Sequence, residues 1–143
     1  MNADADYTPS LEQIDAVLGF LSTFEREDFA PSKVEAPPGQ CPYHVFAQEL
    51  SQFRQVLYDN GFVFSFDWPS WQEEALRYYE HPEFLRAADL QVLRKLLTFH
   101  IRKERFCEGH LSAMVECGHI TAILRRLKEL REASDCSHEG ESV

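Results

Sequence analysis

Apolar residues recur at helical spacing along most of the chain and divide it into predicted helices. The clearest stripe has leucine or isoleucine at positions i, i+3, i+7 and i+11: Leu90, Leu93, Leu97 and Ile101. Asp89 stands just before this stripe, where its side chain can cap a helix, so we predict an amphipathic helix that begins there. The other side of this helix is predicted to be polar, with Gln91, Arg94, Lys95, Thr98 and Arg102.

Two glycines divide the stretch that follows. Gly109 lowers helix propensity, so we expect the first helix to end between Arg105 and Cys107 and a short helix to run from Gly109 to Glu116. Gly118 is the expected C-terminal cap of this short helix. The apolar stripe then resumes and predicts a third helix, which contains Ile120, Ile123, Leu124, Leu127 and Leu130.

The chain opens with another helical pattern, followed by a stretch rich in proline. Ser10 and Gln13 form a capping box for a helix that runs to about Phe24. The segment from Glu25 to Tyr43 contains four prolines and one glycine. Since proline cannot continue a helix, we expect a long irregular loop there, with room for a short strand.

Two further helices follow this loop. The spacing of the apolar residues predicts one that ends at Asn60-Gly61 and contains Phe46, Leu50, Phe53 and Leu57. Ser70 and Glu73 form a second capping box, ahead of a helix that stops at His81-Pro82. Between the two, FVFSFDW is extended but has no obvious partner strand, and Pro82 to Ala87 has room for one helical turn.

These elements predict an all-α fold, with one domain of five to six helices over residues 8–131. A chain of 143 residues is long enough to bury one core. Residues 1–7 have little apolar content and are expected to form a flexible tail. Residues 132–143 are polar and acidic and are expected to form a disordered tail.

The net charge of −10 is unevenly distributed along the chain. From Arg86 to Arg131 there are ten Lys or Arg against five Asp or Glu, a net charge of +5. The preceding 85 residues carry four against fifteen, and the last twelve carry none against four. The acidic total argues against a nucleic-acid or membrane partner, whereas the basic segment favours an anion site within it.

The sequence also bears on compartment and metal content. It has no signal-peptide pattern and no apolar run of about 18 residues, so we expect a cytoplasmic protein without a membrane partner. Its four cysteines are widely spaced, which favours reduced thiols. We expect no metal and no cofactor, although the pairs Cys41/His44 and Cys107/His110 leave a zinc site open as a less favoured alternative.

Two segments, FDWPSW and RFCEGH, carry the residues best suited to a ligand site. Indole faces can stack on a planar ligand, and arginine can bind its negative charge bidentately. Free backbone N–H groups at the predicted helix start near Gly109 would add to the anion site. We therefore expect a binding module for a small anionic ligand or a protein partner. The candidate residues are Asp67, Trp68, Trp71, Arg102, Arg105, Glu108 and His110.

Most of these residues also have a structural interpretation. Trp71 would suit the core, Asp67 could cap a turn ahead of Pro69, and the arginines could pair with carboxylates. His100 lies among apolar residues and is interpreted as a hydrogen-bonded core residue.

Two other functional classes remain open. The segment LSAMVECGHITAILRRL has the rhythm of a helix-turn-helix, with Arg125 and Arg126 predicted to face DNA. The net charge disfavours this DNA-binding alternative. Glu108 and His110 could perform acid–base chemistry if an irregular joint brought them together, but the sequence lacks the strongly specific catalytic motifs.

Three stretches of the second half, FDWPSW, LLTFHIRKERFCEGHL and GHITAILRRL, resemble an uncharacterised family of small bacterial proteins, known only as a domain of unknown function. The resemblance implies a prokaryotic, all-helical, single-domain protein. It transfers no catalytic residues, and no motif of residues 1–41 takes part in it.

Overall fold

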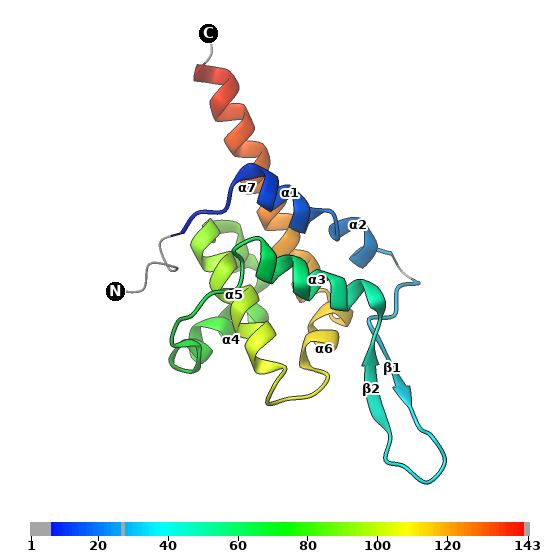
Figure 1. Ribbon diagram of the computed structural model, residues 1–143. Helices are drawn as coiled ribbons and strands as arrows, with labels where there is room; N and C mark the ends of the chain where they lie inside the picture. Colours follow the sequence, from blue (N-terminus) through cyan, green and yellow to red (C-terminus); the bar gives the residue numbers. More distant parts are fainter. Residues whose placement is uncertain (1–6, 27, 142–143) are drawn as a thin grey trace.

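The computed structural model describes residues 7–26 and 28–141, without the side chains of residues 43, 44 and 135–141. Within these residues the chain is mainly α-helical and forms one domain with a small two-stranded sheet (Figure 1). The α-helices are α1 (Leu11–Leu18), α2 (Leu21–Phe24), α3 (Gln48–Asp59), α4 (Gln72–Glu80), α5 (Leu90–Lys103), α6 (His110–Glu116) and α7 (His119–Glu141). Two 3-10 helices, η2 (Trp68–Trp71) and η3 (Pro82–Ala87), and two strands, β1 (Ser32–Glu35) and β2 (Tyr43–Phe46), complete the fold.

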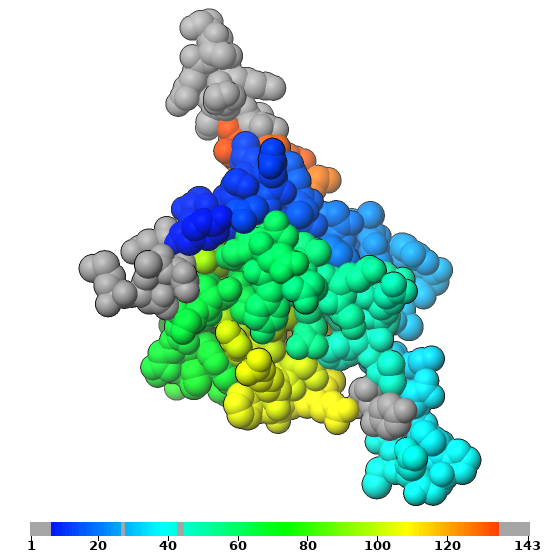
Figure 2. Space-filling view, viewed as in Figure 1, coloured from blue at the N-terminus to red at the C-terminus, as the bar shows by residue number. Residues whose placement is uncertain are grey.

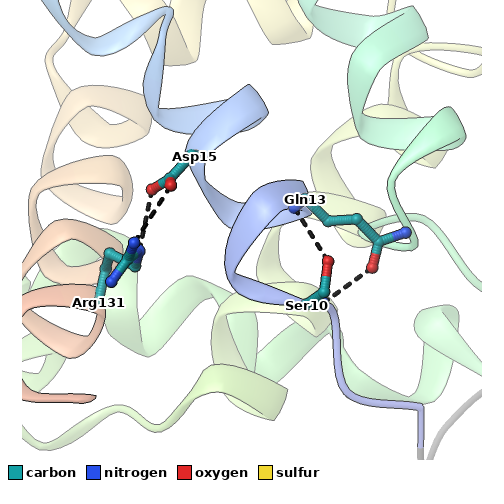
Figure 3. Close-up of polar contacts among 4 residues, drawn as sticks. All are labelled: Ser10, Gln13, Asp15 and Arg131. Atoms are coloured by element: carbon teal, nitrogen blue, oxygen red, sulfur yellow. Dashed lines mark hydrogen bonds and ion pairs between the residues drawn. The ribbon is translucent and has the colours of Figure 1, made fainter. Parts of the chain in front are cut away.

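The predicted N-terminal capping box is confirmed. The Ser10 hydroxyl accepts from the Gln13 backbone N–H, and the Gln13 side chain accepts from the Ser10 N–H (Figure 3). The single helix predicted to Phe24 is wrong, because the chain breaks between α1 and α2. The break places the ring of Phe20 edge-on to Phe53, with centroids 5.4 Å apart.

The proline-rich segment is not wholly irregular, since β1 and β2 form an antiparallel hairpin. It projects beyond the helices in Figures 1 and 2. Phe46, predicted to be helical, pairs with Ser32 at the end of this hairpin. Ala47 is extended and donates its N–H to the carbonyl of Pro31 (2.8 Å), so α3 begins only at Gln48.

The capping box predicted for α4 is also wrong. The Ser70 hydroxyl donates to Asp67 Oδ2 (2.6 Å) within the turn that η2 forms. Trp71 occupies the N-cap position of α4 and provides no side-chain cap. Asp67 stands at the N-cap position of η2, but its side chain caps no backbone N–H group of the described residues and accepts only from the Ser70 hydroxyl, so the predicted cap by Asp67 is wrong. The single helical turn predicted from Pro82 is present as η3.

Helix α7 packs along the rest of the domain, and its N-terminal half contributes Ile120, Ile123, Leu124 and Leu127 to the core. Arg131 pairs with Asp15 of α1 at 3.0 Å and so ties the two helices together (Figure 3). The backbone remains helical to Glu141, through the segment predicted to be disordered. Once the packed turns have formed, each further residue can join the helix with little change in free energy, and this part of the sequence contains no proline that would stop the helix.

The predicted N-terminal tail lies mostly outside the described residues, but Tyr7 is described and is anchored. Its carbonyl accepts hydrogen bonds from Arg94 (2.7 Å) and Gln91 (3.1 Å). None of the described helices combines the length and the apolar character that a bilayer-spanning segment requires.

Candidate functional site

The predicted polar side of α5 lies against segment 61–67, which forms neither helix nor strand, and two of its members, Arg94 and Thr98, hydrogen-bond to the backbone of that segment. The Arg94 guanidinium donates to the Gly61 carbonyl at 2.8 Å. The Thr98 hydroxyl donates to the Phe62 carbonyl (3.0 Å) and accepts from the Phe64 N–H (3.3 Å). Both side chains are buried, so the prediction of an amphipathic helix was wrong for them. Their burial is possible because the unpaired backbone of this segment needs hydrogen-bond partners.

Arg102, further along α5, and Arg105, in the loop after α5, do not bind this backbone. They line a pocket. The pocket has a volume of about 240 Å³ and lies between this segment and the loop after α5. Figure 2 shows the yellow part of the chain around residue 105 at the surface. The lining residues are Phe64, Ser65, Phe66, Trp68, Arg102, Arg105 and Phe106. The structure thus brings Trp68, Arg102 and Arg105 of the predicted site together.

The two arginines differ from Arg94 in what they contact. Among the described side chains, no carboxylate lies within ion-pair distance of Arg102 or Arg105. Arg102 is half-buried, with its guanidinium carbon 5.8 Å from the ring centre of Tyr58, and Arg105 is exposed. Two positive charges therefore lie beside the pocket without a neutralising partner from the described part of the chain.

Aromatic rings form the rest of the pocket wall. Trp68 is half-buried, and its indole lies edge-on to Phe99 with centroids 5.8 Å apart. The ring of Phe106 lies 5.8 Å from the Trp68 ring on the outer side and is 75% exposed. The pocket wall therefore combines aromatic and arginine side chains, two residue types that are enriched at interaction surfaces.

Three other predicted site residues lie outside the pocket lining. Asp67 precedes Trp68, but its carboxylate accepts from Ser70. Trp71 stacks on Tyr78 at 6.4 Å and packs against the core, as its structural interpretation predicted. Glu108 is exposed in the loop before α6.

His110, the last of the predicted site residues, faces the protein interior rather than this pocket. Its Nε2 atom lies 2.9 Å from Nδ1 of His100, and the two rings are stacked. Burial, followed by the nearby charge of Lys103, lowers the pKa of His110 to about 4. No contact between His110 and Glu108 occurs among the described residues, so the geometry offers no support for their use as an acid–base pair.

The start of α6 is not a free anion site, contrary to our prediction. The Glu104 carboxylate accepts from the N–H groups of Gly109 (2.9 Å) and Leu111 (2.8 Å). Glu104 therefore acts as the cap that the sequence does not provide at Gly109. The sequence does contain a signal for this cap, because the carboxylate of Glu104, five residues before the predicted helix start, can reach forward across a tight loop.

The zinc alternative also receives no support from the described residues. Among them, no group of three or more His, Cys, Asp or Glu side chains could hold a metal ion. Cys41 and Cys107 are exposed free thiols, and the side chain of His44 lies outside the described part of the chain.

A comparison with family models places the chain in a family. The model of DUF6508, described as a family of unknown function, matches residues 9–133. The chain belongs to DUF6508. The match extends well beyond the second half that we recognised from its motifs, because it includes α1 and the hairpin. No curated protein and no solved structure matches this DUF6508 chain.

The helix pair α6–α7 of this DUF6508 protein uses its basic residues internally. Arg125 pairs with Glu25 at 3.0 Å. Arg126 donates to the Ala88 carbonyl at 2.9 Å and lies 3.6 Å from Glu129. The two arginines that a helix-turn-helix would present to DNA therefore contact their own chain.

We expect no salt-sensitive, sequence-specific binding of duplex DNA by this DUF6508 protein. Each phosphate contact releases counterions, so a true DNA-binding protein loses affinity steeply as salt rises. Fluorescence anisotropy with labelled duplexes at several salt concentrations measures this directly. Submicromolar binding that weakens with salt and disappears in the Arg125→Ala, Arg126→Ala double variant would contradict the expectation.

Proposed function

We propose that this DUF6508 protein is a binding module that takes a small anionic ligand into the pocket lined by Trp68, Arg102 and Arg105. The observation that carries the proposal is the pair of arginines beside the pocket, neither of which pairs with a described carboxylate. Arg94 supports it by contrast, because the same helix uses that arginine for backbone carbonyls. Arg102, near the end of the same helix, and Arg105, in the loop after it, thus remain available for an external anion.

The size and walls of the pocket suggest the kind of anion. A volume of about 240 Å³ is below the range of roughly 300–1,000 Å³ that is usual for drug-sized ligands. Aromatic walls favour a flat group, and guanidinium groups favour a carboxylate or phosphate. A single planar ring that carries one such group fits these requirements.

A protein partner is the second candidate, and the exposure of Phe106 favours it. Arginine and aromatic residues dominate the binding energy at protein interfaces. An acidic side chain of a partner could enter the pocket while Phe106 packs against the partner's surface.

The cysteine side chains that the structure describes, those of Cys41, Cys107 and Cys117, are exposed free thiols, which suits a reducing cytoplasmic location.

Small planar anions should raise the melting temperature of the protein, and Arg105→Ala should remove this effect. A ligand at a hundred times its dissociation constant adds about 2.7 kcal/mol to the free energy of unfolding. The probes are benzoate, phenyl phosphate, inorganic phosphate and nucleoside monophosphates, measured by thermal shift. Because Arg105 is exposed, the variant should melt within a few degrees of the wild type without ligand.

Arg86→Ala is the matched control, since Arg86 is an exposed arginine that lines a different cavity. It should keep the full ligand response. An equal loss of response in both variants would indicate non-specific screening of charge. A response that persists in Arg105→Ala, or no response to any of these anions, would refute the small-ligand proposal and leave the partner surface to be tested.

A further inference from the structure

Three histidines from three helices meet in the interior, away from the pocket of Trp68 and Arg105. His100 belongs to α5, His110 to α6 and His119 to α7. The ring of His100 stacks on that of His110, with centroids 5.2 Å apart, and lies edge-on to that of His119 at 5.0 Å. We call these residues the histidine cluster. It lies at the junction where α6 packs against both of the longer helices.

The cluster has few partners besides its own members. His100 and His119 are 2% and 5% exposed, and neither Nε2 atom has a hydrogen-bond partner among the residues that the structure describes. Lys103 is the nearest cation from α5. Tyr79 of α4 packs edge-on against His119 at 5.5 Å, and Glu80 and Cys117 line a cavity of about 430 Å³ with His119. No described carboxylate lies within ion-pair distance of the three imidazoles, so an added proton gains no direct salt bridge. The acidic groups nearby are Glu104, bound to the backbone on either side of His110, and Glu80 in the His119 cavity.

Helix α6 is the shortest of the three helices that carry the cluster, and a glycine precedes and follows it. It has only seven residues, and glycines with φ of +87° stand at both of its ends, Gly109 and Gly118. Glycine adopts this conformation without strain and allows the chain to rotate there. Besides His110, α6 is held by the Glu104 cap, by the buried residues Leu111 and Val115, and by a hydrogen bond of 2.6 Å between Ser112 and Ser32.

We propose that the histidine cluster is an acid-operated latch, which holds α6 against α5 and α7 while its imidazoles are neutral and releases α6 when they gain protons. A first proton on the hydrogen-bonded pair of His100 and His110 places a positive charge in the interior, and a second proton on the pair replaces their hydrogen bond by repulsion between charged rings. Release of α6 also moves the loop that ends at Gly109 and carries Arg105 and Phe106. This release would occur whether or not the neighbouring pocket holds a ligand.

The direction of the pH dependence follows from the folded geometry. Burial lowers the pKa values of His110 and His119 to about 4, and it lowers that of His100 well below its ordinary value. A released imidazole binds its proton near pH 6.5. Below that pH the open form therefore binds more protons than the closed form, and each extra proton raises the open population about tenfold per pH unit. Two or three histidines should give an increase of about 100-fold to 1,000-fold per pH unit.

Native-state hydrogen exchange, followed by NMR between pH 6.5 and 4.5, tests the latch in the full chain. The opening constants of the Ala113, Met114 and Val115 amides, corrected for intrinsic exchange, should rise with that slope. The opening constants of the Leu96 and Phe99 amides in α5 should rise much less. If α5 and α6 open together at every pH, the event is global unfolding and the latch is refuted.

Variants separate the histidines from other acid-sensitive groups. His110→Asn should lower the slope of the α6 amides by one proton, which is about tenfold per pH unit. His81→Asn, at an exposed histidine between α4 and η3, and Glu104→Gln, which keeps an acceptor for the α6 cap but cannot titrate, should leave the slope unchanged. An unchanged slope in His110→Asn, or a slope that vanishes in Glu104→Gln, overturns the proposal.

The NMR signals of the histidine ring carbons in the wild type give a second test, which does not depend on the folding of His110→Asn. The ring carbons of the three histidines should titrate together with the exposure of α6. Titration of any of them near pH 6.5 while the α6 amides stay protected would show that protonation does not open the latch.

Discussion

Replacing Arg94 with leucine is expected to lower the free energy of unfolding by about 3 kcal/mol. Arg94 is 1% exposed, and its guanidinium donates to the carbonyls of Gly61 (2.8 Å) and Tyr7 (2.7 Å) and to the side chain of Gln91 (2.7 Å). Its guanidinium carbon also lies 4.3 Å from the ring centre of Phe64. Leucine would remove the Arg94 donor from all three acceptors, of which the Tyr7 carbonyl keeps only its bond from Gln91, and would release the Gly61 backbone from α5.

Urea unfolding monitored by circular dichroism measures this loss, and Arg102→Leu provides the matched control. Arg102 lies two turns further along the same helix and contacts Tyr58 without any hydrogen bond from its guanidinium among the described residues. Replacing Arg102 with leucine should lower the free energy of unfolding by less than about 1 kcal/mol. Equal costs at the two positions would mean that Arg102 is also a scaffold residue, which would weaken the proposed anion site.

This contrast also shows why sequence reasoning succeeded for α5 only in part. The apolar stripe and Asp89 correctly predicted the helix and its cap, because both signals are local. The helical period could not tell which polar residues would be buried. Arg94 and Thr98 are buried because a segment more than thirty residues earlier in the sequence lies against them, and that segment needs hydrogen-bond donors and acceptors.

The hairpin was missed for a similar reason. Four prolines argued correctly against a helix between Glu25 and Tyr43, but pairing of two short strands is a tertiary event that their composition does not encode. The hydrogen bond between Ala47 and Pro31 closes the hairpin and delays α3 to Gln48. Phe46 could be assigned to the helix from its spacing alone, although it lies in a strand.

For the candidate site, the structure brings only some of the predicted residues together. Trp68 of FDWPSW and Arg105 of RFCEGH line one pocket together with Arg102, which lies three residues before the second segment. His110 was grouped with them because of its position in RFCEGH, yet the turn after Gly109 directs it towards His100. The three histidines are separated by ten and nine positions, and only the packing of α5, α6 and α7 brings them together.

The histidine cluster also predicts how the stability of the whole protein depends on pH. Lowering the pH from 7 to 5 should reduce the free energy of unfolding by roughly 4 kcal/mol through His110 and His119, with a further loss from His100. In the unfolded chain these residues titrate near pH 6.5, whereas burial lowers the folded pKa of each of the first two to about 4. The unfolded state therefore binds more protons between these pH values, so the stability present above pH 6.5 is lost as the pH falls.

Urea unfolding at pH 7 and pH 5 tests this loss, and His119→Phe identifies its source. Phenylalanine keeps an aromatic ring against Tyr79 but cannot bind a proton, so the loss between the two pH values should shrink by about 2 kcal/mol. In His81→Asn the free energy of unfolding should fall between pH 7 and pH 5 by as much as in the wild type, because His81 is exposed. If His119→Phe is as acid-sensitive as the wild type, groups outside the cluster cause the acid instability. In that case the buried imidazoles contribute to packing at the helix junction without sensing pH.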